Sequence, residues 1–199
     1  MTTEPRRRPG GRSARVRQSV IEATVAVIAE KGLTDFTVND VAARAGVHAT
    51  SIYRRWGTRD NLITDTLLDY SRHTIPVPDT GSVRADLYRL LTAIAAYLNT
   101  SIGRALAQAL ATGGDESRWQ TVRFEFWTTR LALTRTIVDR AVERGELPPE
   151  TDARLVLEML VAPLQFRTLV TREQFGEELC TRLTDAVLDG IRPRPHVAD

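Results

Sequence analysis

The chain has 199 residues, of which 42% are hydrophobic, and a formal net charge of +2 at neutral pH. This length allows one helical domain with a substantial core, or a small domain followed by a larger one. No apolar run approaches the roughly 18 residues that a membrane span requires, and the arginine-rich N-terminus lacks the apolar stretch of a secretory signal. The only cysteine, Cys180, excludes an intramolecular disulfide and fits a reducing cytoplasm.

Positive charge is concentrated in the first third of the chain. Residues 1–64 hold 11 Lys or Arg against 6 Asp or Glu, whereas the remainder holds 16 against 19. This asymmetry suggests a polyanionic partner at one end of the molecule. Nearly all of the positive charge is arginine, which suits bidentate phosphate contacts, although a GC-rich genome explains the bias equally well. Residues 1–12 combine Pro, Gly and clustered Arg, and predict a flexible basic arm.

Two helices are predicted next along the chain. The first begins at Ser13 and ends at Gly32, which supplies a left-handed stop. The second covers 38–45, with Thr37 as the N-cap of a capping box and Gly46 as the break. The apolar positions that place the first helix on a core are Val16, Val20, Ala23, Val27 and Ile28.

A third helix over 49–55 follows, with His48 as a candidate cap and Ile52 pointing inward. Trp56 and Gly57 end it, and Thr58 caps a fourth helix. The helices over 38–45 and 49–55, on either side of Gly46, meet the requirements of a helix-turn-helix. Ala42 allows the two helices to cross closely, and Ile52 anchors the helix over 49–55 on the core. The helix over 49–55 then presents its polar residues outward, and its N-terminus can enter the major groove of DNA.

The second half of the chain again has helical periodicity, after a domain boundary at residues 75–81 that contains two prolines and a glycine. Predicted helices cover 83–98, 102–110 and 116–144. Thr151 or Asp152 caps the next, which runs to 170 with a kink or break at Pro163. A capping box at 171–174 opens the last helix, and Gly190 and Pro193 end it. The fold class is therefore all-α, with about nine helices.

Residues 17–62, about a quarter of the chain, resemble the DNA-binding domain of tetracycline-repressor (TetR) type regulators. The resemblance rests on the stretches 37–47, 50–56 and 59–62. Three residues depart from the family pattern: His48 stands where Ser is usual, Trp56 where Phe is usual, and Arg59 where Lys is usual. The resemblance implies an N-terminal reading domain over 13–74 and a C-terminal ligand-binding and dimerisation domain over 82–192.

The resemblance also implies a set of DNA contacts, with a nucleoid location in the cytoplasm and double-stranded palindromic DNA as the partner. Tyr53 donates its hydroxyl to the DNA backbone, and the alternative is that its ring packs at the edge of the core. Arg54 and Arg55 reach guanine or the DNA backbone, and the alternative is that they form a solvated helix face. The implied DNA-binding residues are Thr37, Asn39, His48, Ala49, Thr50, Ser51, Tyr53, Arg54, Arg55 and Arg59. Further phosphate or minor-groove attraction comes from Arg6, Arg7, Arg8, Arg12, Arg15 and Arg17.

For the C-terminal domain the resemblance implies a homodimer and a small-molecule effector, with no cofactor and no membrane partner. Two apolar stripes are interpreted as the dimer seam, although ordinary core packing is the alternative. They contain Leu155, Met159, Ala162 and Phe166, and then Phe175, Leu179, Leu183 and Val187. The central helix is rich in aromatic residues, which suits either core or a ligand pocket. The pocket candidates are Trp119, Arg123, Trp127 and Gln165.

Two other functions compete with ligand-released repression. An enzyme would need a nucleophile with a base, a carboxylate pair or a metal cluster, and the histidines at 48, 73 and 196 are scattered. We therefore expect no catalytic and no metal site. A DNA-binding dimer without a ligand is the second alternative. The C-terminal segment of about 120 residues exceeds what dimerisation requires, which favours ligand sensing.

Overall fold

The computed structural model describes residues 11–112 and 117–191, and its regular structure over these two ranges is entirely helical. The all-α prediction is confirmed for this part of the chain. No helix within it is both long and apolar enough to span a bilayer. The elements are α1 (Gly11–Asp35), α2 (Val38–Ala45), α3 (Ala49–Trp56), α4 (Arg59–Thr74), α5 (Val83–Leu98), α6 (Ser101–Thr112), α7 (Ser117–Glu143), α8 (Ala153–Phe166), a π-helical turn η1 (Arg167–Thr171) and α9 (Glu177–Ile191).

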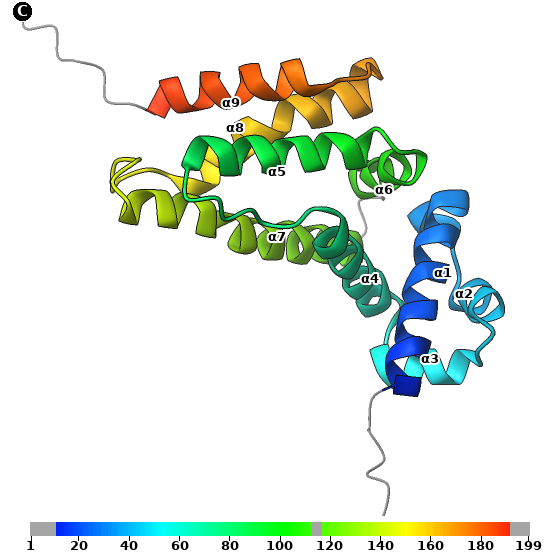
Figure 1. The fold of residues 1–199 in the computed structure, drawn as a ribbon. Helices are drawn as coiled ribbons and strands as arrows, with labels where there is room; N and C mark the ends of the chain where they lie inside the picture. The colour runs from blue at the N-terminus through cyan, green and yellow to red at the C-terminus, as the bar shows by residue number, and fades with distance from the viewer. Residues whose placement is uncertain (1–10, 113–116, 192–199) are drawn as a thin grey trace, which may run out of the picture.

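Helices α1, α2 and α3 form a head at one end of the molecule, and α8 and α9 lie at the opposite end (Figure 1). Helix α4 leads from the head to the larger part, where α5 and α7 run between the two ends. The predicted linker at 75–81 contains no helix. The head is therefore held away from α8 and α9, so a partner bound at one end leaves the other end accessible.

Local capping explains why α2 and α3 form where they do. The Thr37 hydroxyl accepts the Asp40 N–H at 3.2 Å, and the Asp40 carboxylate accepts the Thr37 N–H at 3.1 Å, which completes the predicted capping box. Gly46 ends α2 with φ 66°, a left-handed conformation that costs a residue with a Cβ about 1–2 kcal/mol. Thr58 caps α4 by accepting the Asn61 N–H at 3.1 Å. These three predictions are confirmed.

The buried side chains form two clusters, and the first joins the head to the larger part. This head cluster contains residues of α1 to α4 such as Ile28 and Ile52, together with Leu106 of α6 and Phe126 of α7. The second cluster lies among α5, α7, α8 and α9. Helices α6 and α7 therefore pack against the head as well as against the larger part of the molecule.

Several predicted boundaries differ from the structure. Helix α1 begins at Gly11, two residues before Ser13, and Val16 is 37% exposed instead of packing on the core. Gly32 has φ 77° inside the assigned span, so the regular helix does end there as predicted. The expected break at Pro163 is absent, since α8 continues to Phe166 and the irregularity follows as η1. Asp152 is the cap of α8 and accepts two backbone N–H groups.

The predicted start of the last helix is wrong. Residues 172–176 are not helical, and α9 begins at Glu177. Arg172 adopts a left-handed backbone with φ 56°, and the Asn99 side chain donates to the Phe175 carbonyl oxygen at 2.8 Å. This hydrogen bond and the burial of the Phe175 ring hold a non-helical segment where a capping box was predicted. The end of α9 at Ile191 agrees with the predicted stop, which was placed at Gly190 and Pro193.

Candidate DNA-binding surface and ligand cavity

Helix α3 presents a polar face to solvent and an apolar face to the head cluster. Ile52 is 1% exposed and Trp56 is also buried, as predicted. Thr50, Tyr53 and Arg54 lie on the opposite side and are exposed, with Tyr53 at 49%. The exposed Tyr53 ring does not fit the alternative of core-edge packing. The structure therefore brings three of the predicted contacts together on one accessible helix face.

The other predicted contacts around α3 are placed less uniformly. Ala49 and Ser51 are half-buried, and Ala49 packs against the head cluster. Thr37 and Asn39 are exposed near α2, but the Thr37 hydroxyl already donates to Asp40 at 2.8 Å. His48 stands at the N-cap position of α3, but its side chain makes no capping hydrogen bond, so its predicted capping role is wrong. The imidazole is instead exposed beside the first turn of α3.

Two arginines of the predicted DNA-binding set already make contacts within the head. Arg59 donates to the backbone carbonyl oxygens of Leu33 and Phe36, and its guanidinium lies 4.5 Å from the centroid of the Phe36 ring. It therefore satisfies carbonyl groups at the end of α1, and its role as a phosphate ligand is not supported. Arg55 is exposed, but it donates to Ser13 Oγ at 3.1 Å and lies over the Trp56 ring at 5.5 Å.

Arg17 belongs to an ion-pair network and not to a free basic arm. Its guanidinium is 2.6 Å from Asp69 and 2.9 Å from Asp65, and Asp65 also accepts the Trp56 indole N–H at 2.9 Å. The network fixes α1 and the end of α3 onto α4. Sequence reasoning missed it, although the tryptophan at a usual phenylalanine position was a signal, because a buried indole N–H needs an acceptor.

The rest of the predicted arm lies partly beyond the described residues. Arg6, Arg7, Arg8 and the side chain of Arg12 fall outside them. Arg15 lies in the first turns of α1 and is exposed. Of the predicted arm cations within the structure, Arg15 is therefore the one at the surface.

The junction between α1 and α2 is fixed by further charges. Lys31 is 2.8 Å from Asp40, and Arg44 of α2 is 2.8 Å from Glu30 of α1. The hydrogen bond with Lys31, and then that with Thr37, lowers the pKa of Asp40. Asp40 therefore stays ionised throughout the neutral range and holds the capping box closed. These contacts orient α2 and with it the outward face of α3.

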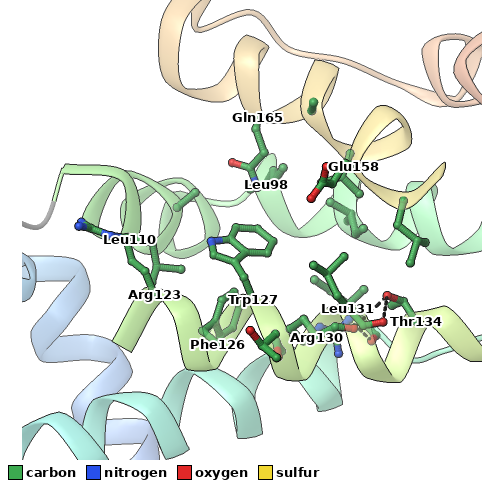
Figure 2. Close-up of a pocket in the computed structure, with 18 of the residues that line it drawn as sticks. Leu98, Leu110, Arg123, Phe126, Trp127, Arg130, Leu131, Thr134, Glu158 and Gln165 are labelled. Atoms are coloured by element: carbon green, nitrogen blue, oxygen red, sulfur yellow. Dashed lines mark hydrogen bonds between the residues drawn. The ribbon is translucent and has the colours of Figure 1, made fainter. Parts of the chain in front are cut away.

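A cavity of about 740 Å³ lies between α4, α5, α6, α7 and α8 (Figure 2). Its walls are mainly apolar, and they include Phe126, Trp127 and Leu131 of α7, Leu98 of α5 and Leu157 of α8. Polar side chains are few, and Gln165 and Glu158 stand on the α8 side, across from Arg130 on α7. Apolar walls with a few placed polar groups, at this volume, are typical of a small-molecule site.

Three of the four pocket candidates line this cavity. They are Arg123 and Trp127 of α7 and Gln165 of α8. Trp119 lies in the first turn of α7, where the side chains fall outside the described residues. Sequence reasoning missed Arg130, which is 7% exposed and lines the same cavity. Arg130 lies one helical turn after Trp127, at a position that the periodic pattern assigns to the core. The pattern therefore did not indicate that a cation is buried there.

The two stripes interpreted as a dimer seam have different surroundings. On α8, Leu155 is 50% exposed, Met159 40% and Phe166 55%, and Ala162 is exposed between them. The α9 residues are core instead. Phe175 and Val187 are buried in the second cluster, and Leu179 and Leu183 pack against it, so the seam interpretation is wrong for Phe175 and Val187.

The exposed stripe on α8 continues into η1, where Val170 is 64% exposed. Its members stand at intervals of four, three, four and four residues, which places them on one helix face. At 1.5 Å per residue the stripe is about 22 Å long. An apolar surface of this extent is typical of a protein interface and is costly when exposed to water. We call this surface, formed by residues 155, 159, 162, 166 and 170, the α8 face.

The head, the polar face of α3 and the separate cavity define the class of the protein as a helix-turn-helix transcription regulator. The comparisons with known proteins agree. A model described as bacterial regulatory proteins, tetR family, matches residues 20–66, and one described as tetracyclin repressor-like, C-terminal domain, matches residues 77–187. The chain belongs to the TetR family of transcriptional regulators, and it binds DNA through its helix-turn-helix.

Individual relatives extend over most of the chain. The HTH-type transcriptional regulator AqdR of Rhodococcus erythropolis is 40% identical over 146 residues, covering 73% of this chain and 70% of the relative. YdeS of Bacillus subtilis strain 168 is 26% identical over 176 residues, with 88% and 89% coverage. The crystal structure of the TetR family regulator SCO0332 superposes with a TM-score of 0.74 at 28% identity, covering 89% of this chain and 99% of that one.

Proposed function

We propose that this chain is a homodimeric repressor that binds a palindromic operator and is released by a small molecule bound in the cavity. The observation that carries the proposal is the pairing of an exposed polar α3 with a cavity whose helices pack into the head cluster. One head makes too few base contacts for specific binding, and two heads related by a two-fold axis read both halves of a palindrome. Two-fold pairing therefore gives the DNA-binding head its specificity.

The α8 face is the proposed contact between the two protomers. It is apolar, continuous along one helix and placed at the end of the molecule opposite α3 (Figure 1). A two-fold axis through α8 would bring the same residues of both copies together and leave both heads on the other side. We propose a second copy of this chain as the partner, because its own α8 face offers the same apolar residues to the contact.

Phe166→Glu is therefore expected to convert the dimer to a monomer. The ring is 55% exposed in one protomer, so the substitution does not disturb the core, but it places two carboxylates at a self-contact. Sedimentation velocity should show the mass of one protomer, with unchanged helicity. The matched control is Tyr53→Glu, where the ring is 49% exposed on α3, at the end of the molecule opposite α8. A Phe166→Glu protein that stays dimeric would contradict this interface.

The packing of α6 and α7 supports the proposal that a bound ligand releases the protein from its operator. Both helices line the cavity, through Ala107 and Leu110 and through Phe126 and Trp127. Leu110 and Phe126 also belong to the head cluster. A ligand that favours one arrangement of these helices would change the separation of the two heads, which must match a groove repeat of about 34 Å. FadR of Bacillus subtilis, solved in complex with stearoyl-CoA, has a similar fold, with a TM-score of 0.65 at 18% identity over 87% of this chain.

Selection of bound duplexes from a random pool tests the DNA part of the proposal. We expect a palindrome of roughly 15–20 base pairs whose half-sites lie about one helical turn apart. Affinity should fall steeply with salt, because phosphate contacts release counterions. Enrichment of a single asymmetric site would contradict the two-fold arrangement. A DNA-binding dimer without a ligand is the second candidate, and it would be favoured if no apolar compound raises the melting temperature.

A further inference from the structure

The wall of the cavity contains a buried cation without an anionic partner. Arg130, in the middle of α7, is 7% exposed and lines the cavity. Its Nη2 donates to the Ile75 carbonyl oxygen at 3.1 Å. Over residues 11–112 and 117–191, this is the only hydrogen bond of the guanidinium, and no carboxylate pairs with it. A guanidinium has five N–H donors, so most of its donor capacity is unused.

Several other arginines are paired with carboxylates. Arg17 binds Asp65 and Asp69, Arg84 binds Asp185, and Arg140 lies 3.0 Å from Asp79. All three are more exposed than Arg130. At the rim of the cavity, Arg154 already pairs with Glu158 at 2.7 Å. The least exposed of these guanidinium groups is therefore the one that lacks an acid.

The surroundings of Arg130 make this arrangement unfavourable in the empty protein. Burial lowers the pKa of Arg130, and the positive charge of Arg72 lowers it further. A buried charge is stable when it is paired and hydrogen-bonded, and removal of a partner is costly. The site therefore gains free energy when an anion enters the cavity and accepts the unused N–H groups.

We infer that the cavity takes a largely apolar molecule carrying one carboxylate or comparable oxyanion, which Arg130 binds. Trp127, Leu131 and Leu157 line the space for the apolar body of the ligand. Tyr97 lines the same cavity, and burial raises the pKa of its hydroxyl, so that it remains a donor at neutral pH. This inference rests on the proposed ligand response and adds the chemical class of the ligand.

Two fluorescent probes with the same aromatic skeleton test the inference. 1-Anilinonaphthalene-8-sulfonate carries an anion, and N-phenyl-1-naphthylamine does not. We expect Arg130→Met to weaken sulfonate binding about tenfold relative to the neutral probe, because a hydrogen bond to a charged group is lost. Arg89→Gln removes an equal charge from an exposed position on α5 that does not line the cavity, and it should leave the ratio of the two dissociation constants unchanged. An unchanged ratio in Arg130→Met would overturn the inference.

A cavity-filling variant separates this failure from failure of the proposed function. Leu157 is 2% exposed and lines the cavity, so Leu157→Trp should reduce binding of both probes. If both probes bind Leu157→Trp as they bind the wild type, the cavity is not their site and the ligand part of the proposed function fails. If Leu157→Trp blocks both probes but Arg130→Met leaves their ratio unchanged, only the anion preference is wrong.

A wild-type measurement keeps the test valid if Arg130→Met does not fold. Decanoate and decanol have chains of equal length and differ in the charge of the head group. We expect decanoate to displace bound N-phenyl-1-naphthylamine at a concentration about tenfold lower than decanol does. Displacement by decanol at an equal or lower concentration would contradict the inference, since the alcohol is the more hydrophobic of the two.

Discussion

Thr50→Glu is expected to abolish operator binding, with a loss of at least about 100-fold in affinity. Thr50 is exposed on the face of α3 opposite Ile52, so a carboxylate there faces the phosphates and base edges of the groove. Loss of a base contact costs about 1–3 kcal/mol, and the added charge repulsion applies in both heads of a dimer. Fluorescence anisotropy with the selected duplex measures the effect.

The control for this substitution is Ala96→Glu. Ala96 is exposed on α5, so the variant adds the same charge to the chain on a helix outside the head. Both variants should melt at the temperature of the wild type, because neither position is buried. Equal operator affinity for Thr50→Glu and Ala96→Glu would show that α3 does not carry the DNA contacts.

Leu106→Ala is expected to lower the free energy of unfolding by about 2–5 kcal/mol, which is the usual cost of a buried leucine truncation. Leu106 lies on α6 and is 0% exposed within the head cluster, where α6 packs on α1. The truncation leaves a void in the head cluster and therefore weakens the packing of α6 against α1. Chemical denaturation at a fixed protein concentration gives the loss, because the stability of a dimer depends on concentration.

Leu91→Ala is the matched control, since Leu91 is also 0% exposed but belongs to the second cluster. Both variants should lose similar stability. Hydrogen exchange then distinguishes them: Leu106→Ala should reduce amide protection in α1, whereas Leu91→Ala should reduce it in α5 and α9. The same exchange pattern in the two variants would contradict the role of α6 as the link between the cavity and the head.

Features of the fold that depend on neighbouring residues could be predicted from the sequence. The capping box of Thr37 and Asp40, the left-handed turn at Gly46 and the cap at Thr58 each form within four residues of the chain. The inward anchor Ile52 follows from helical periodicity in the same way. These local signals were sufficient to locate the helix-turn-helix and to place Thr50, Tyr53 and Arg54 on one face.

Features that depend on distant residues could not be predicted. Arg17 and Asp69 are 52 residues apart, and Arg59 reaches carbonyl groups 23 and 26 residues away. Both arginines resembled free phosphate ligands because the sequence does not show their partners. The predicted capping box at 171–174 is wrong for the same reason, since the hydrogen bond from Asn99 and the burial of Phe175 hold residues 172–176 out of a helix.

A disulfide cross-link tests the position of α3 most directly. The native Cys180 is 0% exposed and burial raises the pKa of its thiol, so Thr50→Cys introduces a single reactive cysteine. We expect this cysteine to couple to a thiol tethered in the major groove of the selected half-site. It should not couple to the same tether in the minor groove. Coupling to the minor-groove tether, or equal coupling to both, would contradict entry of α3 into the major groove.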